Sequence, residues 1–300
     1  MDAFALLLLC LGLGVVLGRS GQLPRQAPQA FNAWILKVAL PALVLVQIPR
    51  LQFDWALLFP ILAPWFVILG AWLLFAGLGR WLGWDRALIG CLVMVCGFGN
   101  TAFLGLPMIQ ALQGPAALPT AVIADQMGSF LALSSVGIVV AAAYGGRSLQ
   151  LADLARRVLL FPPFLALVLA FVVAALGSWP AAVESVLQRL ADTLAPLALF
   201  SVGLQFRAGA LRADWQASAL GLSWKLLLAP LILWGVAFGT GLSGPTVTVG
   251  LLQAAMAPMI TAGIIAGEHG LRPALASALV SAGILLSFLS VPLWSYALGL

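Results

Sequence analysis

The sequence predicts an all-α integral membrane protein whose ten transmembrane helices form two inverted five-helix repeats, with broken fourth and ninth helices. Three observations predict this fold class: the composition, the spacing of apolar runs and their basic connections, and a partial internal repeat. Of the 300 residues, 63% are hydrophobic and 8% are charged, and the mean hydropathy is +1.12. Soluble domains are about 25% charged. The composition by itself therefore indicates a membrane protein.

Apolar runs recur along the whole chain with short polar breaks between them. A helix of about 20 apolar residues crosses a hydrocarbon core of about 30 Å. The first run resembles a signal peptide, but Asp2 precedes it and its basic residue, Arg19, follows it, so we interpret it as a helix. No soluble domain fits between the runs, so residues 1–300 are expected to form one membrane domain. The predicted spans are 3–18, 28–49, 57–79, 87–113, 117–144, 157–177, 185–206, 216–241, 245–268 and 272–298.

The basic residues predict the orientation of these spans. They fall on alternate connections, and the opposite connections carry only Arg50 and Arg189. Because short loops rich in Lys and Arg remain in the cytoplasm, we expect a multi-pass protein of the cell (inner) membrane with both termini outside the cytoplasm. The net charge of +5 is then explained without a nucleic-acid partner. The basic connections hold Arg19, Arg25, Arg80, Arg86, Arg147, Arg156, Arg157, Arg207, Arg212 and Arg272.

Two halves of the chain, 1–146 and 147–300, share a partial repeat. "KVALPALVLVQIPRLQF" from Lys37 and "DTLAPLALFSVGLQF" from Asp192 both have an early proline, small and branched apolar residues, and a Leu-Gln-Phe ending. Their lengths differ by two residues, so the alignment needs a gap. "DW" follows in both halves. Since five spans is an odd number, the second half would be inverted, which is typical of secondary transporters.

The fourth and ninth spans are interrupted at corresponding places. "GFGNTAFLGLPMI" at 97–109 holds three glycines, Asn, Thr and Pro, and Pro258 lies in the middle of the ninth span. Proline removes a helical hydrogen bond and glycine weakens a helix. Irregular backbone in lipid is tolerated only where protein or a water-filled cavity satisfies it. A simple proline kink is one interpretation. Two repeat-related breaks favour the other, in which half-helix amides form an anion site.

At these residues the sequence resembles the auxin efflux carrier family, which includes the plant PIN carriers and bacterial carriers for malonate or malate. The similar motifs are "GNTAFLGLPMIQALQG" at 99–114 and "APMITAGIIAGEHGLRPALAS" at 257–277. The resemblance implies a scaffold of helices 1, 2, 6 and 7, often dimeric. A transport unit of helices 3–5 and 8–10 would carry the substrate, with helices 4 and 9 crossing at their breaks and moving in an elevator-like way. The related bile acid/sodium symporter fold is arranged similarly.

Two departures from the large plant carriers argue against auxin as the substrate. The long cytoplasmic loop is absent from this sequence, and Gly99, Asn100 and Thr101 stand where those carriers also place a proline. The crossing of the fourth and ninth helices is still expected.

The predicted substrate-binding residues lie at the two breaks. An amide and a hydroxyl there can hydrogen-bond a carboxylate, or they can simply cap the second half-helix. The sequence leaves these alternatives open. The predicted residues are Gly99, Asn100, Thr101, Pro107, Pro258, Met259 and Thr261.

Asp125 is the acidic residue that lies well inside a span, which marks it as a functional candidate because charge is expensive in hydrocarbon. The alternative is a structural hydrogen bond to the broken backbone. We expect Asp125 to support the crossing or to bind a coupling cation, with Gln126 and Ser129 as neighbours. Lys225 is a further coupling or supporting candidate. Its depth is equally compatible with snorkelling, in which the side chain extends its charge to the membrane surface, and with a role in a cavity. The alignment of Lys37 with Asp192 across the repeat favours a scaffold ion pair for both lysines.

Other residue classes constrain the function. Cys10, Cys91 and Cys96 lie in apolar spans and His269 ends one, so neither a metal, a cofactor nor a disulfide is expected. The Gly14/Gly18 and Gly235/Gly239 pairs each fit close helix packing.

The leading hypothesis is a secondary active transporter of a small organic anion such as a mono- or dicarboxylate, coupled to protons, sodium or membrane potential. A sodium-coupled bile-acid-type symporter is the near alternative. A channel needs a polar path that the spans lack. An intramembrane enzyme needs paired acidic residues, a metal cluster or a Ser-His pair, and no catalytic residue is assigned.

Overall fold

The computed structural model describes residues 2–24, 26–146, 156, 158–206 and 214–298. Helices, turns and loops make up these residues, which contain no strand and one isolated β-bridge. Within them, five continuous helices are long and apolar enough to cross a membrane: Ala27–Arg50, Trp55–Leu82, Pro115–Gly145, Trp215–Thr240 and Pro273–Ala297. Three shorter apolar helices are Phe4–Ser20, Arg86–Gly97 and Pro162–Leu176. An all-helical fold with candidate membrane spans is thus confirmed for the described residues, whereas the ten-span inverted repeat stays a prediction.

The α-helices follow one another with few long connections. They are α1 (Asp2–Ser20), α2 (Ala27–Trp34), α3 (Leu40–Gln47), α4 (Leu58–Leu82), α5 (Arg86–Gly97), α6 (Leu106–Gln113), α7 (Leu118–Ile123), α8 (Ile138–Gly145), α10 (Pro162–Leu176), α11 (Ala181–Ala191), α12 (Leu194–Leu204), α13 (Trp215–Ser223), α14 (Ala229–Thr240), α15 (Pro245–Ala254), α16 (Ile260–Glu268) and α17 (Pro273–Ala297).

Short π-helical and 3₁₀ segments extend or join these helices. The π-helical turns are η1 (Ile35–Ala39), η4 (Thr101–Gly105), η6 (Ala124–Phe130), η7 (Leu133–Gly137) and η8 (Trp224–Leu228); the 3₁₀ turns are η2 (Ile48–Arg50), η3 (Trp55–Leu57) and η5 (Pro115–Ala117).

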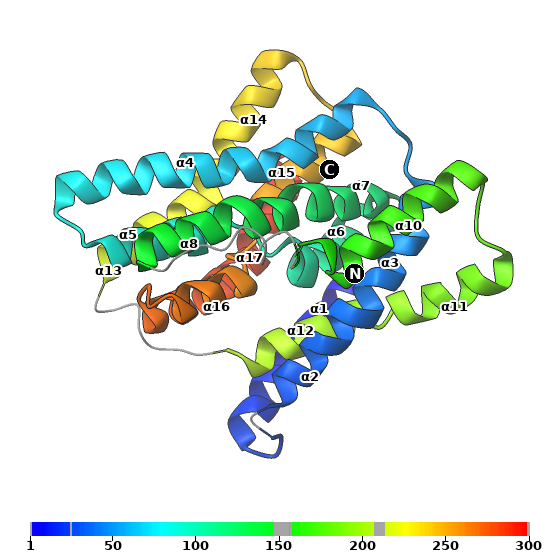
Figure 1. The fold of residues 1–300 in the computed structure, drawn as a ribbon, viewed down its shortest axis with the longest axis horizontal. Helices are drawn as coiled ribbons and strands as arrows, with labels where there is room; N and C mark the ends of the chain where they lie inside the picture. Colours follow the sequence, from blue (N-terminus) through cyan, green and yellow to red (C-terminus); the bar gives the residue numbers. More distant parts are fainter. Residues whose placement is uncertain (1, 25, 147–155, 157, 207–213, 299–300) are drawn as a thin grey trace.

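Two groups of helices make up the molecule (Figure 1). In one, α5 packs against α4, α8 and α16, and α16 also packs on α17. In the other, α1, α2 and α12 pack together, while α3 packs against α10 and α11. The apolar side chains between the helices form a continuous buried core. The assignment of these helices to a scaffold and a transport unit, and the movement of one against the other, stay predictions.

The α1–α12 contact is close because both helices present glycine. A Cβ atom on Gly14 would overlap the Phe200 carbonyl oxygen and lie 2.9 Å from the Gly203 Cα. Small residues allow helix backbones to approach in this way, which increases van der Waals contact where lipid provides no hydrophobic driving force. The Phe31 and Phe200 rings pack edge to face beside this contact, with centroids 5.3 Å apart.

Within the predicted span at 185–206 the helix is not continuous, because the structure divides it into α11 and α12 around Asp192 and Thr193. Polar side chains explain the division. The Thr193 hydroxyl donates to the Leu190 carbonyl at 2.6 Å, and the Gln188 amide donates to Asp192 at 2.7 Å. The Thr193 bond uses a backbone carbonyl and therefore competes with helical hydrogen bonds.

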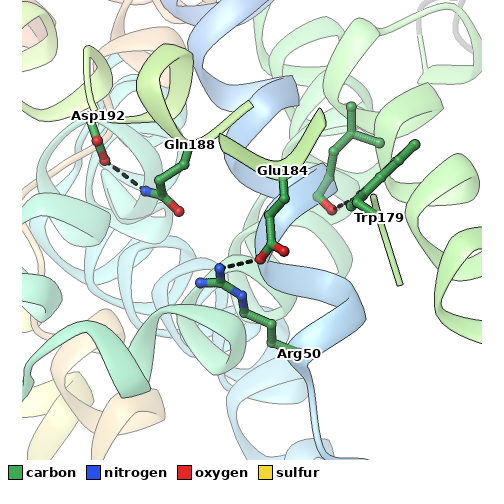
Figure 2. Close-up of polar contacts among 6 residues, drawn as sticks. Arg50, Trp179, Glu184, Gln188 and Asp192 are labelled. Carbon is green, nitrogen blue, oxygen red and sulfur yellow. Dashed lines mark hydrogen bonds and ion pairs between the residues drawn. The ribbon is translucent and has the colours of Figure 1, made fainter. Parts of the chain in front are cut away.

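Figure 2 shows how α11 is held against the end of α3. The Arg50 guanidinium donates to the Glu184 carboxylate at 2.5 Å, and the Trp179 indole N–H donates to the Leu45 carbonyl at 2.8 Å. Asp192 points to Gln188 rather than to a lysine. Lys37 is exposed, and none of the ion pairs among the described residues includes Lys37 or Lys225. The predicted scaffold ion pair is therefore not found in this part of the chain.

One end of the molecule, which we call the basic end, carries the described connections rich in arginine: those after α1, between α4 and α5, and between α16 and α17. Arg25, Arg147, Arg157, Arg207 and Arg212, which also support the predicted orientation, lie outside the described residues. At the basic end, the Arg272 guanidinium pairs with the Asp85 carboxylate and lies 3.7 Å from the Asp214 carboxylate. These contacts join the residues that immediately precede α5, α13 and α17.

Replacing Asp85 by Asn should reduce stability in a pH-dependent way. The Leu88 backbone N–H, and after it the Arg272 guanidinium, hold the pKa of the Asp85 carboxyl below its usual range. A carboxyl whose pKa is lower in the folded than in the unfolded protein stabilises the fold at pH values above its unfolded pKa of about 3.9. This stabilisation is lost as the pH falls through the folded pKa. Because the Asp85–Arg272 pair is half exposed, we expect the free energy of unfolding of the wild type to exceed that of the variant by less than about 1 kcal/mol at neutral pH.

Thermal unfolding of the two proteins in detergent between about pH 7 and pH 3 measures this difference. The gap in unfolding midpoint should narrow as the pH falls. Asp54→Asn, which changes an exposed carboxylate, is the control and should show little change at any pH. A gap for Asp85→Asn that stays constant over the whole range would contradict the assignment.

Candidate functional site

The two interrupted spans have their breaks where proline and glycine predict them. In the fourth span, α5 ends at Gly97 and helical structure resumes at Thr101. In the ninth, α15 ends at Ala254 and α16 begins at Ile260. The predicted interruptions are therefore present in the structure, and each divides its span into two short helices.

The interrupted segments, residues 98–100 and 255–259, pair with each other, and we call this region the crossing. Gly99 and Pro258 form an antiparallel β-bridge. Each segment thereby satisfies backbone groups that the other leaves without helical partners, which is how irregular backbone is tolerated inside a membrane. The bridge consists of hydrogen bonds from Asn100 N to the Ala257 carbonyl at 2.7 Å and from Met259 N to the Phe98 carbonyl at 3.0 Å.

Glycines allow this close approach. A Cβ atom on Gly99 would lie 3.1 Å from the Lys225 Nζ and 3.2 Å from the Gln253 carbonyl oxygen. Gly283 of α17 packs directly against the Pro258 ring, where a Cβ would overlap the ring carbons. Pro258 itself lacks an N–H group, so it leaves no backbone donor unsatisfied at the break.

Asp125 lies beside the first break, and its role as a supporting residue stays a prediction. The Thr101 hydroxyl donates to Asp125 Oδ1 at 2.5 Å, and the Gln126 amide donates to Oδ2 at 2.7 Å. Asp125 is 3% exposed and Thr101 is 1% exposed. Thr101 begins the second half-helix, and a helix N-terminus favours nearby negative charge. The carboxylate is thus held by these two side chains rather than by the broken backbone.

π-helical turns carry four of the predicted residues. Thr101 is in η4, Asp125 and Gln126 are in η6, and Lys225 is in η8. A π-helical turn widens the helix and leaves a carbonyl or side chain out of the regular pattern, and such turns are frequent at functional sites. The sequence did not predict them. Turns of the same kind at η1 and η7 show that the feature alone does not define a site.

Several buried polar atoms near the crossing have no hydrogen-bond partner among the described residues. They include Asn100 Nδ2, Gln126 Oε1, Ser129 Oγ and Gln253 Oε1. A buried polar group left unpaired costs about 1–3 kcal/mol. The Asn100 side chain makes no capping bond, so capping does not account for it. The structure thus leaves one amide donor and several acceptor oxygens available to a ligand.

Gln253 belongs to this cluster, although the sequence pattern did not assign it to the site. Its side-chain oxygen lies 2.5 Å from the position that a Cβ on Gly105 would occupy, and its amide is 3.5 Å from the Ala121 carbonyl. A sequence signal was present, because Gln253 is the polar side chain of the otherwise apolar stretch at 249–257. Its orientation was not evident from that stretch.

Lys225 reaches the crossing from η8. It is 1% exposed, and its ammonium donates to the Ala254 carbonyl at 2.5 Å. Because the nitrogen is buried between helices, snorkelling to the membrane surface is excluded. Of the two interpretations that its depth left open, a role in a cavity stays a prediction.

The remaining predicted residues differ in burial. Pro107 is buried in α6, and Met259 is buried and belongs to the crossing, where its backbone N–H donates to Phe98. Thr261 lies on the exposed face of α16 and does not join the buried polar atoms.

Two cavities lie between the two helix groups. The larger, about 1060 Å³, is at the basic end and is lined by α1, α2 and α12 on one side and by α16 and α17 on the other. Its wall includes Ile260, which directly follows the second break. The smaller, about 270 Å³, is at the opposite end and includes Pro107, Gln110 and Asp192. The second half of each broken span therefore lines one cavity.

The chain is similar to known proteins over nearly its whole length. A family model described as "Membrane transport protein" (Mem_trans) matches residues 1–295. An uncharacterized transporter of Methanothermobacter thermautotrophicus is 26% identical over 289 residues, covering 95% of this chain and 94% of the relative. An uncharacterized transporter of Methanocaldococcus jannaschii is 22% identical over 306 residues, covering 99% and 98%.

A plant relative links the chain to the predicted family. Auxin efflux carrier component 3a of Oryza sativa subsp. japonica is 28% identical over 125 residues, which cover 41% of this chain and 20% of that protein. These relatives are transporters, which are not enzymes. With the family model matched from residue 1 to residue 295, the chain belongs to the Mem_trans family of membrane transport proteins, and its predicted likeness to the auxin efflux carriers is confirmed.

Proposed function

We propose that this protein is a secondary active transporter that moves a small organic anion, such as a mono- or dicarboxylate, across the cell (inner) membrane. The observation that carries the proposal is the buried Asn100 amide, whose Nδ2 donor has no partner among the described residues and lies where the second half-helix begins. A carboxylate accepts hydrogen bonds from such a donor, and a helix N-terminus favours its charge.

Transport by an elevator-like movement would use the two helix groups described above. The scaffold would consist of α1, α2, α3, α10, α11 and α12, and the other helices would carry the crossing. The unequal cavities support alternating access, because a large cavity at the basic end is lined by Ile260 of the ninth span and a small one at the opposite end by Pro107 of the fourth. In the proposed orientation the basic end is cytoplasmic and both termini are outside. A homodimer formed through the scaffold completes this proposal.

One observation favours sodium coupling as the alternative. Asp125 supplies a carboxylate, and Gln126 Oε1 and Ser129 Oγ on the same π-helical turn are oxygen acceptors without a partner among the described residues. Hard cations prefer oxygen ligands of this kind. Proton coupling through the same carboxylate is the other form of this proposal.

Uptake into liposomes that contain the purified protein tests the substrate class. We expect labelled mono- or dicarboxylate to enter saturably and to exchange with carboxylate loaded inside, because a carrier binds its substrate on each side in turn. Organic cations of similar size should neither enter nor compete. Replacing sodium by choline in the same assay distinguishes sodium from proton coupling. Transport of organic cations, with carboxylates neither transported nor inhibitory, would overturn the proposal, and flux without saturation or exchange would indicate a channel.

A further inference from the structure

The Lys225 ammonium occupies a position that neither a scaffold ion pair nor snorkelling explains. It donates a hydrogen bond to the carbonyl of Ala254, the last residue of α15. The last carbonyls of a helix lack helical donors and carry the negative end of the helix dipole. The positive charge of Lys225 is therefore placed against the end of the first half of the ninth span.

The same ammonium lies against the other broken span. Its Nζ is 3.1 Å from the position that a Cβ on Gly99 would occupy, and the Gln253 carbonyl oxygen is 3.2 Å from that position. No carboxylate pairs with Lys225 among the described residues. The Lys225 nitrogen thus lies between the two interrupted helices, with the Ala254 carbonyl as its hydrogen-bond acceptor.

An ammonium group resembles a small monovalent cation in this setting. It is a compact point charge with three donors on a flexible stem, and charge inside the membrane is retained only where protein groups stabilise it. Discontinuous helices in transporters commonly direct their C-terminal carbonyls at a cation. At this crossing a side chain of the protein itself fills that position.

We propose that Lys225 is a positioning residue that acts as a built-in monovalent cation, holding the carbonyl end of α15 against the Gly99 backbone. It takes the place of a dissolved cation at this point of the crossing. Its effect on transport rests on the proposed function, whereas its effect on the stability of the crossing does not. A second cation at Asp125 is a separate matter, because that carboxylate binds Thr101 at the other half-helix.

Two variants separate the charge of Lys225 from its volume. Lys225→Ala removes the ammonium and most of the stem, leaving a space beside the Ala254 carbonyl that methylammonium or sodium can enter. Lys225→Met removes the charge but fills the stem volume, so no cation can enter. Lys37→Ala is the matched control, because Lys37 also lies in a π-helical turn but is exposed.

Thermal unfolding midpoints of the purified proteins are measured in detergent with choline, sodium or methylammonium chloride at equal ionic strength. We expect Lys225→Ala to unfold at lower temperature in choline and to gain at least about 3 °C in methylammonium or sodium relative to choline. The wild type, Lys37→Ala and Lys225→Met should not respond selectively to these salts, and Lys225→Met should remain less stable than the wild type.

The same variants are then assayed for carboxylate uptake. Lys225→Ala should lose at least about tenfold in choline and regain activity with the salt that restores its midpoint. A Lys225→Ala protein that no cation stabilises, including one lost from purification in every salt, would overturn the proposal. A Lys225→Met protein with the same thermal unfolding midpoint as the wild type would also overturn the proposal. If the wild type transports no carboxylate, the proposed function fails, whereas the salt response of Lys225→Ala still decides the role of Lys225.

Discussion

Asp125→Asn is expected to lower carboxylate transport at least about tenfold, which corresponds to about 1.4 kcal/mol in the barrier, while the protein remains folded in the membrane. The wild-type carboxylate accepts one hydrogen bond from Thr101 and one from Gln126. The substitution keeps the size of the side chain and removes its charge. It therefore removes the group that we propose to support the crossing or to bind the coupling cation.

The fold should tolerate this change because Gln126 can adapt. Its Oε1 atom has no partner among the described residues, so rotation of the Gln126 amide lets that oxygen accept from the new amide at position 125. The amide NH₂ groups of residues 125 and 126 then do not face each other. The loss in transport would consequently report the charge rather than a packing defect.

Uptake into liposomes, with equal amounts of folded protein, measures the effect of Asp125→Asn. Asp54→Asn provides the control, because it makes the same chemical change at an exposed carboxylate. Asn100→Ala, assayed for substrate binding in the same preparation, should weaken binding if Asn100 contacts the substrate. Normal transport by Asp125→Asn, with unchanged dependence on pH and sodium, would mean that Asp125 is structural and that the functional site lies elsewhere.

Gly14→Val is expected to lower the free energy of unfolding by about 1–3 kcal/mol. The new side chain would meet backbone atoms of α12, namely the Phe200 carbonyl oxygen and the Gly203 Cα. Backbone atoms cannot move aside as a flexible side chain does, so α1 and α12 must separate. The contact of these two helices would then lose both its close packing and its regular geometry.

Gly12→Val is the matched control, because Gly12 lies on the same helix and a Cβ atom there would meet no heavy atom of another described residue within 4 Å. Its unfolding midpoint should change little, since exposed substitutions usually alter stability by no more than about 0.5 kcal/mol. Thermal unfolding of both variants in one detergent tests the pair. Equal midpoints for Gly12→Val and Gly14→Val would show that the α1–α12 contact does not depend on glycine.

The glycine pairs illustrate the limit of sequence patterns. Gly14/Gly18 and Gly235/Gly239 have the same spacing and the same apolar setting. Gly14 and Gly18 both lie against α12, whereas no described atom comes within 4 Å of a Cβ on Gly235 or Gly239. Spacing shows that a close approach is allowed, but the partner helix must come from a distant part of the chain.

The site shows the same limit at single residues. Asp125 was recognised because a carboxylic acid in an apolar span is unusual, and the structure places it beside Thr101 as an interaction near the break requires. Gln253 was not assigned, and Thr261 was assigned but lies on an exposed face. These differences arise from the direction in which a side chain points, which depends on how the helices turn and pack.

By itself, the sequence determined that the chain is a helical membrane protein of the auxin efflux carrier kind and where its fourth and ninth spans break. Hydropathy and the effects of proline and glycine act over consecutive residues, so these properties can be read locally. Only the tertiary structure decided that Gly99 pairs with Pro258, that Lys225 contacts the end of α15 and that α11 is separate from α12. Unpaired backbone and charge in an apolar interior must find partners, and those partners lie far away in the sequence.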